Sequence, residues 1–255
     1  MLNVNLRPFI LLALVIIFWS DQTMAGVLAL PQFKSSEERQ KLEYQALQGS
    51  PDAAEKIVGI LALFPSSDRL YWATIAAENS SYKGAYNLAV FLVDPGTDGV
   101  EPYEGYAKDR EWYWLIKAAN SGHELAIYTL KTDFPQSKKL HLEPDKEVKQ
   151  WVLSNKTLPK YKRAAMRGSP EAAYRLCQHY SFSPASELKE GLFWATIAAQ
   201  NSHPKAPYIV GKLLLKTGKP NDHERALFWL RKAATTGDKD AIKLLEMESP
   251  GEGKK

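Results

Sequence analysis

The sequence predicts an all-α protein built as an array, or α-solenoid, of about six helical hairpins, and two observations support this prediction. The first is a nonapeptide that occurs twice: residues 72–80 and 194–202 differ only by Glu78 in the first copy and Gln200 in the second. The second observation is a spacing of 31 to 46 residues between related segments of the chain. That spacing is the period of helical-hairpin repeats.

An Ala-Ala pair, or its equivalent, gives six segments a common frame. We number each segment from the first residue of this pair, which is Gln45, Ala76, Ala118, Ala164, Ala198 or Ala233. In four segments a tryptophan stands four residues before this zero position, as Trp72, Trp114, Trp194 and Trp229. The other two segments carry Lys41 and Lys160 there. Residues four apart share a helix face, so each indole lies beside a small Ala that lets a neighbouring helix approach.

Three further positions, counted from the same zero residue, predict a turn and a second helix in every segment. Position +4 holds a residue that can end or cap a helix: Gly49, Ser80, Gly122, Gly168, Ser202 and Gly237. Position +8 holds a small residue: Ala53, Gly84, Ala126, Ala172, Ala206 and Ala241. Position +12 holds an aliphatic one: Ile57, Leu88, Leu130, Leu176, Val210 and Leu245. Each segment is therefore predicted to be helix, tight turn and helix.

The pattern Trp-x-x-x-Ala-Ala-x-x-Gly-x-x-x-Ala-x-Tyr-x-Leu resembles the Sel-one-like repeat, a relative of the tetratricopeptide repeat. The loop residues Gly99-Val100 and Thr217–Asp222 are similar to that family's loop between hairpins. The resemblance covers about residues 40–247 and is strongest in the second, third, fifth and sixth segments. It implies a right-handed solenoid of Sel-one-like hairpins over residues 33–247.

The first hairpin is expected within residues 33–64, with a helix over Glu37–Gln48 and a second helix that Pro51 opens at its first turn. The second hairpin is expected over Leu70–Val93, and turn-forming residues make 94–99 a loop.

The longest departure from the period is the insertion Lys131–Pro159, in which we expect a short helix over Asp145–Leu153. Insertions in repeat arrays map to loops on one face, often the binding face. A binding loop and a non-functional elaboration are equal alternatives here. The last three hairpins are expected to end at Met247, and residues 248–255 form a polar tail predicted to be disordered.

Residues 1–25 have the order of a secretory signal peptide. One positive charge at Arg7 precedes a twelve-residue apolar run, Pro8–Trp19, which is short for a membrane-spanning helix. We expect cleavage after Ala25, with Ala29 as a second candidate site and an uncleaved N-terminal anchor as the alternative. The signal predicts export, the resemblance to Sel-one-like proteins of bacterial envelopes implies a periplasmic location, and any membrane contact is expected only through this segment.

The sequence offers little catalytic chemistry. Cys177 is the only cysteine, so no internal disulfide can form, and a single Cys on a helix is usually a small buried hydrophobe. His179 follows two residues later and lies on a different helix face, so we do not expect a Cys-His catalytic pair. None of the five histidines forms a His-Glu-x-x-His motif, and no phosphate-binding loop is present. We therefore predict no catalytic residue, cofactor or metal site.

Charge and aromatic residues suggest partners. The net charge is +4, but basic residues alternate with acidic ones and runs such as Lys138-Lys139 are short, so we do not expect nucleic-acid binding. The basic run Lys160, Lys162 and Arg163 is a candidate contact for an acidic partner. The tyrosines at position +10 are a second candidate partner-binding set, although we favour a packing role for them: Tyr86, Tyr128, Tyr174 and Tyr208.

The family resemblance implies a function as well as a fold. Sel-one-like proteins of bacterial envelopes bind other proteins, and some are immunity proteins that block an antibacterial effector, such as a type VI secretion phospholipase. We accordingly expect a non-catalytic periplasmic protein whose partner is another protein of that effector class, bound by surface complementarity. The alternative is an envelope scaffold or regulatory adaptor that assembles other proteins.

Overall fold

The computed structural model describes residues 32–62, 68–94, 105–134, 153–182 and 188–248. This part of the chain is all-α, as predicted, and its helices belong to one compact unit that begins at Phe33. The twelve helices of these residues are α2 (Ser36–Leu47), α3 (Pro51–Leu61), α4 (Asp68–Glu78), α5 (Tyr82–Phe91), α6 (Ala107–Asn120), α7 (Glu124–Asp133), α8 (Leu158–Met166), α9 (Pro170–Phe182), α10 (Leu188–Gln200), α11 (Ala206–Leu215), α12 (Pro220–Ala234) and α13 (Lys239–Glu248).

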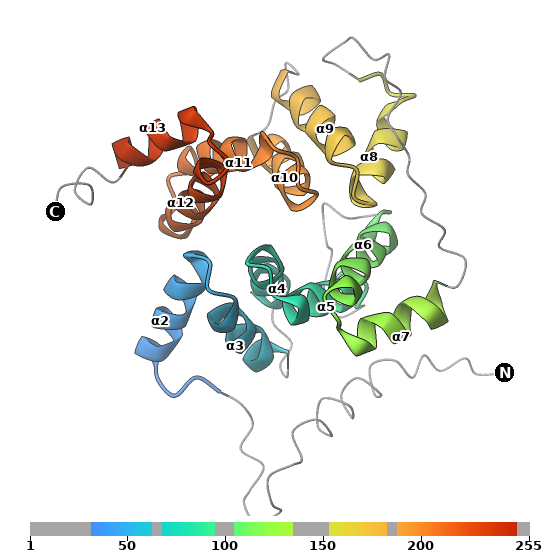
Figure 1. The fold of residues 1–255 in the computed structure, drawn as a ribbon, viewed down its shortest axis with the longest axis vertical. Helices are drawn as coiled ribbons and strands as arrows, with labels where there is room; N and C mark the ends of the chain where they lie inside the picture. The colour runs from blue at the N-terminus through green and yellow to red at the C-terminus, as the bar shows by residue number, and fades with distance from the viewer. Residues whose placement is uncertain (1–31, 63–67, 95–104, 135–152, 183–187, 249–255) are drawn as a thin grey trace, which may run out of the picture. The chain divides into compact units, whose positions relative to one another are not determined.

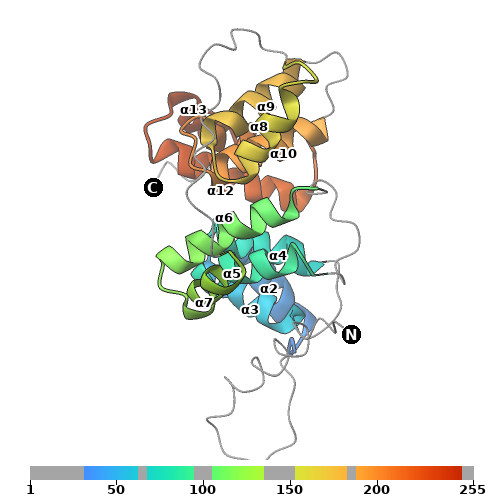
Figure 2. The same cartoon turned by 90° about the vertical axis from the view of Figure 1, so that its right-hand side faces the viewer.

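The helices pack in sequence order, which is the packing expected of a helical repeat. From α2 to α7, and again from α8 to α13, each helix contacts the next one along the chain. We call α2–α7 the first half and α8–α13 the second half. Figure 2 shows them as two groups, with α2–α7 in blue to green and α8–α13 in yellow to red.

The same turn closes the first helix of all six hairpins. In each, the backbone N–H of residue +5 donates to the carbonyl of residue zero, at 2.9 to 3.3 Å, as for Ser81 to Ala76. All six residues at +4 have positive φ, including Ser80 (72°) and Ser202 (71°). The expectation that Ser80 caps the next helix is wrong, because Ser80 itself takes the left-handed conformation and Ser81 is the N-cap of α5.

The packing columns lie in the core. The four tryptophans at −4 are at most 3% exposed, and every alanine at +8 is at most 4% exposed. At +12 the aliphatic residues are fully buried except Leu130 on α7 and Leu245 on α13, which are partly buried. These two helices end the two halves, so no following hairpin covers them in sequence order.

The hairpin boundaries match the predictions to within a few residues. The expected helix Glu37–Gln48 is α2, and Pro51 opens α3 as predicted. The described chain resumes after the insertion at Leu153, which is not helical, and the rest of the predicted helix Asp145–Leu153 lies outside the described residues. The predicted signal segment 1–25 and the predicted tail after Glu248 also lie outside them.

Two helix pairs make the largest contacts between the two halves among the described residues. Helix α6 contacts α8, and α12 contacts α2, so the last hairpin meets the first (Figure 1). We call the α6 contacts with the second half the central junction and the α12 contacts with the first half the closing junction. Each junction uses a helix that precedes the final helix of its half.

A glycine at the closest helix approach gives a test of this packing. A Cβ added to Gly84 would lie 2.5 Å from Ala76 Cβ and 2.7 Å from the Ala76 carbonyl carbon, so Gly84→Ala should destabilise the protein by about 1–3 kcal/mol. The control is Gly59→Ala in α3, where an added Cβ would have no atom within 4 Å. This substitution should increase the free energy of unfolding by up to about 1 kcal/mol. Urea denaturation measures both. Equal effects of the two substitutions would contradict the close approach.

Candidate functional site

A buried arginine holds the closing junction together. Arg225 on α12 is 4% exposed, and its Nη1 donates to Asn79 Oδ1 at 2.8 Å and to the Leu47 carbonyl at 3.3 Å. Its Nη2 donates to Glu78 Oε2 at 2.7 Å. The guanidinium carbon lies 3.7 Å from the centre of the Phe228 ring. One side chain thus ties α12 to the C-terminal ends of both α2 and α4.

The central junction repeats this arrangement. Arg110 on α6 is fully buried, and its Nη1 donates to Asn201 Oδ1 at 2.9 Å and to the Met166 carbonyl at 3.4 Å. Its Nη2 donates to Gln200 Oε1 at 2.5 Å, and its guanidinium carbon lies 4.0 Å from the centre of the Tyr113 ring. Each of these contacts has an equivalent at Arg225. In that equivalent contact, α12 takes the place of α6, α2 that of α8 and α4 that of α10. The two junctions are related by an internal pseudo-two-fold.

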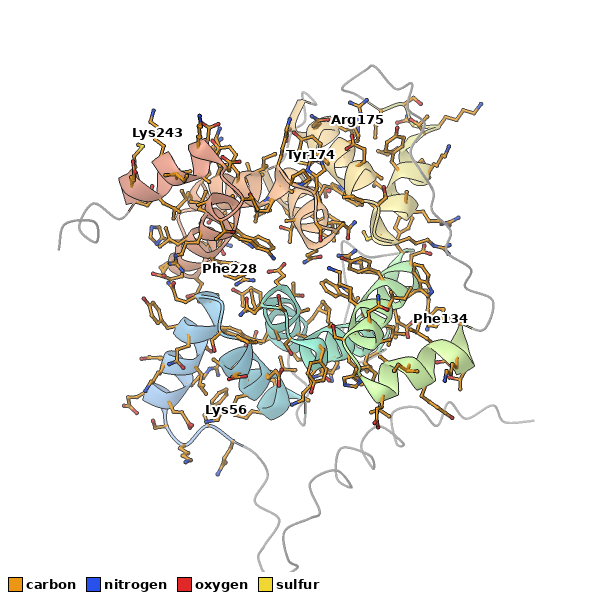
Figure 3. The ribbon with its side chains drawn as sticks, in the orientation of Figure 1. Lys56, Phe134, Tyr174, Arg175, Phe228 and Lys243 are labelled. Atoms are coloured by element: carbon orange, nitrogen blue, oxygen red, sulfur yellow. The ribbon has the colours of Figure 1, made fainter. Side chains whose placement is uncertain are left out.

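The aromatic ring at each junction rests on a left-handed glycine. A Cβ added to Gly49 would lie 2.8 Å from the Phe228 ring, and one added to Gly168 would lie 2.7 Å from the Tyr113 ring. Both glycines have φ above 100°. Figure 3 shows Phe228 on the side of α12 that faces α2. Glycine is required at both turns for two reasons: it permits the left-handed backbone conformation, and it leaves space for the aromatic ring.

A hydrogen bond across the pseudo-two-fold accounts for the one difference between the two nonapeptides. Gln200 Nε2 donates to Glu78 Oε1 at 2.6 Å, so the two non-identical residues meet. Two carboxylates at this distance would repel each other, whereas two amides would leave Arg225 without its carboxylate partner. The identical asparagines beside them also have a local role: besides accepting from the arginines, Asn79 and Asn201 each donate to carbonyls of the preceding hairpin.

A cavity of about 400 Å³ adjoins this network and is lined by helices of both halves. Trp114 and Trp229 form part of its wall, and Lys117 and Lys232 project from the last turns of α6 and α12. Both lysine side chains reach solvent, yet the surrounding protein lowers the pKa of each, with burial as the main cause. Lys117 Nζ also donates to the Gln200 carbonyl at 3.2 Å.

The predicted tyrosine column divides into packed and exposed members. Tyr86 stacks on the imidazole of His123, with ring centres 4.3 Å apart, and Tyr174 stacks on His203 at 4.0 Å. Each histidine belongs to the next hairpin, and burial lowers the pKa of both. Tyr128 on α7, in contrast, is 66% exposed. The packing interpretation therefore accounts for the stacked pair, and partner binding stays a prediction for the column.

The remaining predicted positions lie in the second half. Tyr208 on α11 is partly buried, and Lys212 Nζ lies 5.8 Å from its ring centre. On α8, Lys160 is exposed, Lys162 lies over the Tyr180 ring, and the Arg163 side chain is 59% exposed with its Nε 3.5 Å from Asp109 Oδ2. These basic residues lie on α8, whereas the four tyrosines lie on α5, α7, α9 and α11.

The candidate catalytic pair is engaged in packing. Cys177 is 2% exposed, and burial raises the pKa of its thiol to about 11. His179 Nδ1 accepts a hydrogen bond from the Leu153 backbone N–H at 3.0 Å, and burial lowers the pKa of this imidazole. Among the described residues, no group of three or more His, Cys, Asp or Glu side chains is placed to hold a metal ion. No helix of that part of the chain is both long and apolar enough to cross a membrane.

The sequence did not predict the hydrogen-bond network of Arg110 and Arg225. Arg110 and Arg225 stand at position −8 of the third and sixth hairpins, and both are followed four residues later by the frame's tryptophan. Their recurrence three hairpins apart, like that of the nonapeptide, was a signal that hairpins one to three correspond to hairpins four to six. It could not show that the two sets contact each other.

The comparisons with known proteins add little about function. No model of a known protein family matches the chain. The chain is 29% identical over 153 residues to an uncharacterized protein of Neisseria meningitidis serogroup B. The match covers 60% of this chain but 28% of that relative's length.

A charge swap tests the network. Glu78→Gln removes the carboxylate that pairs with Arg225 and should destabilise the protein by about 3 kcal/mol or more. Gln200→Glu should also destabilise, because a second carboxylate then faces Glu78. The double variant Glu78→Gln with Gln200→Glu moves the carboxylate to the equivalent place beside Arg110 and should recover most of the loss. Urea denaturation of all four proteins measures this, and additive losses in the double variant would contradict the pseudo-two-fold.

Thiol reactivity tests the role of Cys177. A pKa of about 11 leaves little thiolate at pH 8, and the side chain is buried, so Ellman's reagent should label the native protein at least about a hundredfold more slowly than the urea-unfolded chain. Because the chain has one cysteine, the signal is unambiguous. Rapid labelling of the native protein would show an accessible, activated thiol and would revive the Cys-His hypothesis.

Proposed function

We propose that this chain is an exported, non-catalytic protein-binding repeat protein, built as a right-handed solenoid of Sel-one-like hairpins. We further propose that it acts in the periplasm as an immunity protein that blocks a secreted antibacterial effector of the type VI secretion phospholipase class. The effector's active cleft is occluded by surface complementarity, so inhibition needs no chemistry on this chain. Export through residues 1–25 is part of the same proposal.

The observation that supports protein binding best is the uncovered outer face of α7. Tyr86 and Tyr174 are each covered by a histidine of the next hairpin, whereas Tyr128 at the same frame position is 66% exposed. Tyrosine is enriched at protein interfaces because it combines a large apolar ring with a polar tip. Helices α7 and α8 flank the insertion, and Arg163 on α8 is also exposed. These residues are our first candidates for the contact with the effector.

A competition assay tests the immunity role. Cells that lack the gene should lose viability beside sister cells that deliver the matching effector, and they should survive beside sister cells that lack it. Restoring the gene on a plasmid should restore survival. Harmless deletion beside effector-delivering cells would overturn the immunity proposal and favour the envelope scaffold or regulatory adaptor.

A pair of variants tests the exposed residues Tyr128 on α7 and Arg163 on α8. Tyr128→Ala combined with Arg163→Ala should weaken binding to the purified effector at least about tenfold, as expected for loss of an exposed aromatic anchor and a charge. Tyr44→Ala is the control, because Tyr44 is 56% exposed on α2 in the first hairpin. Biolayer interferometry gives both affinities. Equal binding by the two variants would show that the effector contacts another part of the protein.

A further inference from the structure

The cavity between the halves is built from matched pairs of residues. Its eighteen lining residues form nine pairs, six of them 122 positions apart and three of them 115 positions apart. Lys117 pairs with Lys232, Trp114 with Trp229, and Glu78 with Gln200. The cavity therefore lies on the internal pseudo-two-fold, and both halves present equivalent groups to it. Its volume of about 400 Å³ falls in the range of small-molecule sites.

Positive charge dominates the side chains around this cavity. Lys117 and Lys232 line it, and Arg110 and Arg225 lie behind them in the network. The nearby acidic group in the lining is Glu78, which Arg225 and Gln200 already engage. Glu78 attracts Lys232, but the two lysines repel each other, and each is also repelled by the arginine of its own helix. An anion between the ammonium groups would relieve this repulsion.

The helix termini do not remove this excess of positive charge. The C-terminal ends of α4, α6, α10 and α12 and the N-terminal ends of α5 and α11 border the cavity. At about half a charge for each end, they amount together to about one negative charge. The five side chains named above carry four positive charges against one negative charge.

We propose that this cavity binds a small organic anion with a carboxylate or phosphate group, held between Lys117 and Lys232. The lining suits a compact carbon body that carries polar groups, because alanine, proline and tryptophan side chains form part of it and serine and threonine hydroxyls form another part beside the two ammonium groups. The site is separate from the α7 and α8 face proposed for protein binding. It gives the protein a second kind of ligand, and binding would add a further contact between its two halves.

Isothermal titration of the full-length protein with succinate, and separately with inorganic phosphate, tests the proposal. At least one of them should bind in a one-to-one ratio above a sodium chloride control of equal ionic strength. The succinate and phosphate arms distinguish a carboxylate ligand from a phosphate ligand. The double variant Lys117→Gln with Lys232→Gln should weaken that binding at least about tenfold, because both charge-assisted hydrogen-bond donors are lost. Binding should also weaken as the pH rises through the lowered pKa of the lysines.

The matched control is Lys131→Gln with Lys243→Gln, which removes the same charge from exposed positions on α7 and α13. Figure 3 shows Lys243 on α13, a helix that contributes no residue to the cavity lining. The control should bind as the unmodified protein does, and circular dichroism should show unchanged helix content in both variants. No binding of either probe above the chloride control would overturn the proposal. Equal weakening in both double variants would also overturn it, because the effect would then be one of total charge.

Discussion

The ion pair between Arg225 and Glu78, 2.7 Å apart and almost completely buried, is the contact on which the closing junction depends. A buried charge without a partner costs several kcal/mol, so the loss of either residue alone should destabilise the protein. The pair joins residues 147 positions apart, and Gln200 extends it to the second half. A helical repeat can stack its hairpins by apolar contact alone. Here a polar network additionally links the last hairpin to the first two hairpins of the chain.

The network explains why the two halves are similar but not identical. At the pseudo-two-fold, equivalent residues must contact each other, and identical acids or identical amides there would be unfavourable. The change from Glu78 to Gln200 resolves this conflict with one substitution. Tyr113 and Phe228 are a second difference, because Tyr113 Oη donates to the Gln200 carbonyl at 2.5 Å and a phenylalanine ring cannot. Burial raises the pKa of Tyr113 to about 12, which keeps this donor protonated.

The hairpins were predictable from the sequence because their determinants are local. Tryptophan at −4, alanine at zero and a left-handed residue at +4 act within one hairpin or between neighbours, and the structure confirms all six frames, including those with Lys41 and Lys160. The junctions were not predictable, because they depend on small rotations added over several hairpins. Arg110 and Arg225 consequently gave no hint of their partners. The exposure of the tyrosines at position +10 was not predictable for a similar reason. The neighbouring hairpin determines that Tyr86 is covered and Tyr128 exposed.

Native-state hydrogen exchange, read by mass spectrometry, tests most directly whether the closing junction holds the first and last hairpins together. In the unmodified protein, α2 should be as well protected as its equivalent α8, because each is held by an arginine of the other half. In an Arg225→Gln variant, α2 and α12 should lose protection together while α6 and α8 keep theirs. Strong exchange of α2 in the unmodified protein, or equal loss across all helices in the variant, would contradict the account.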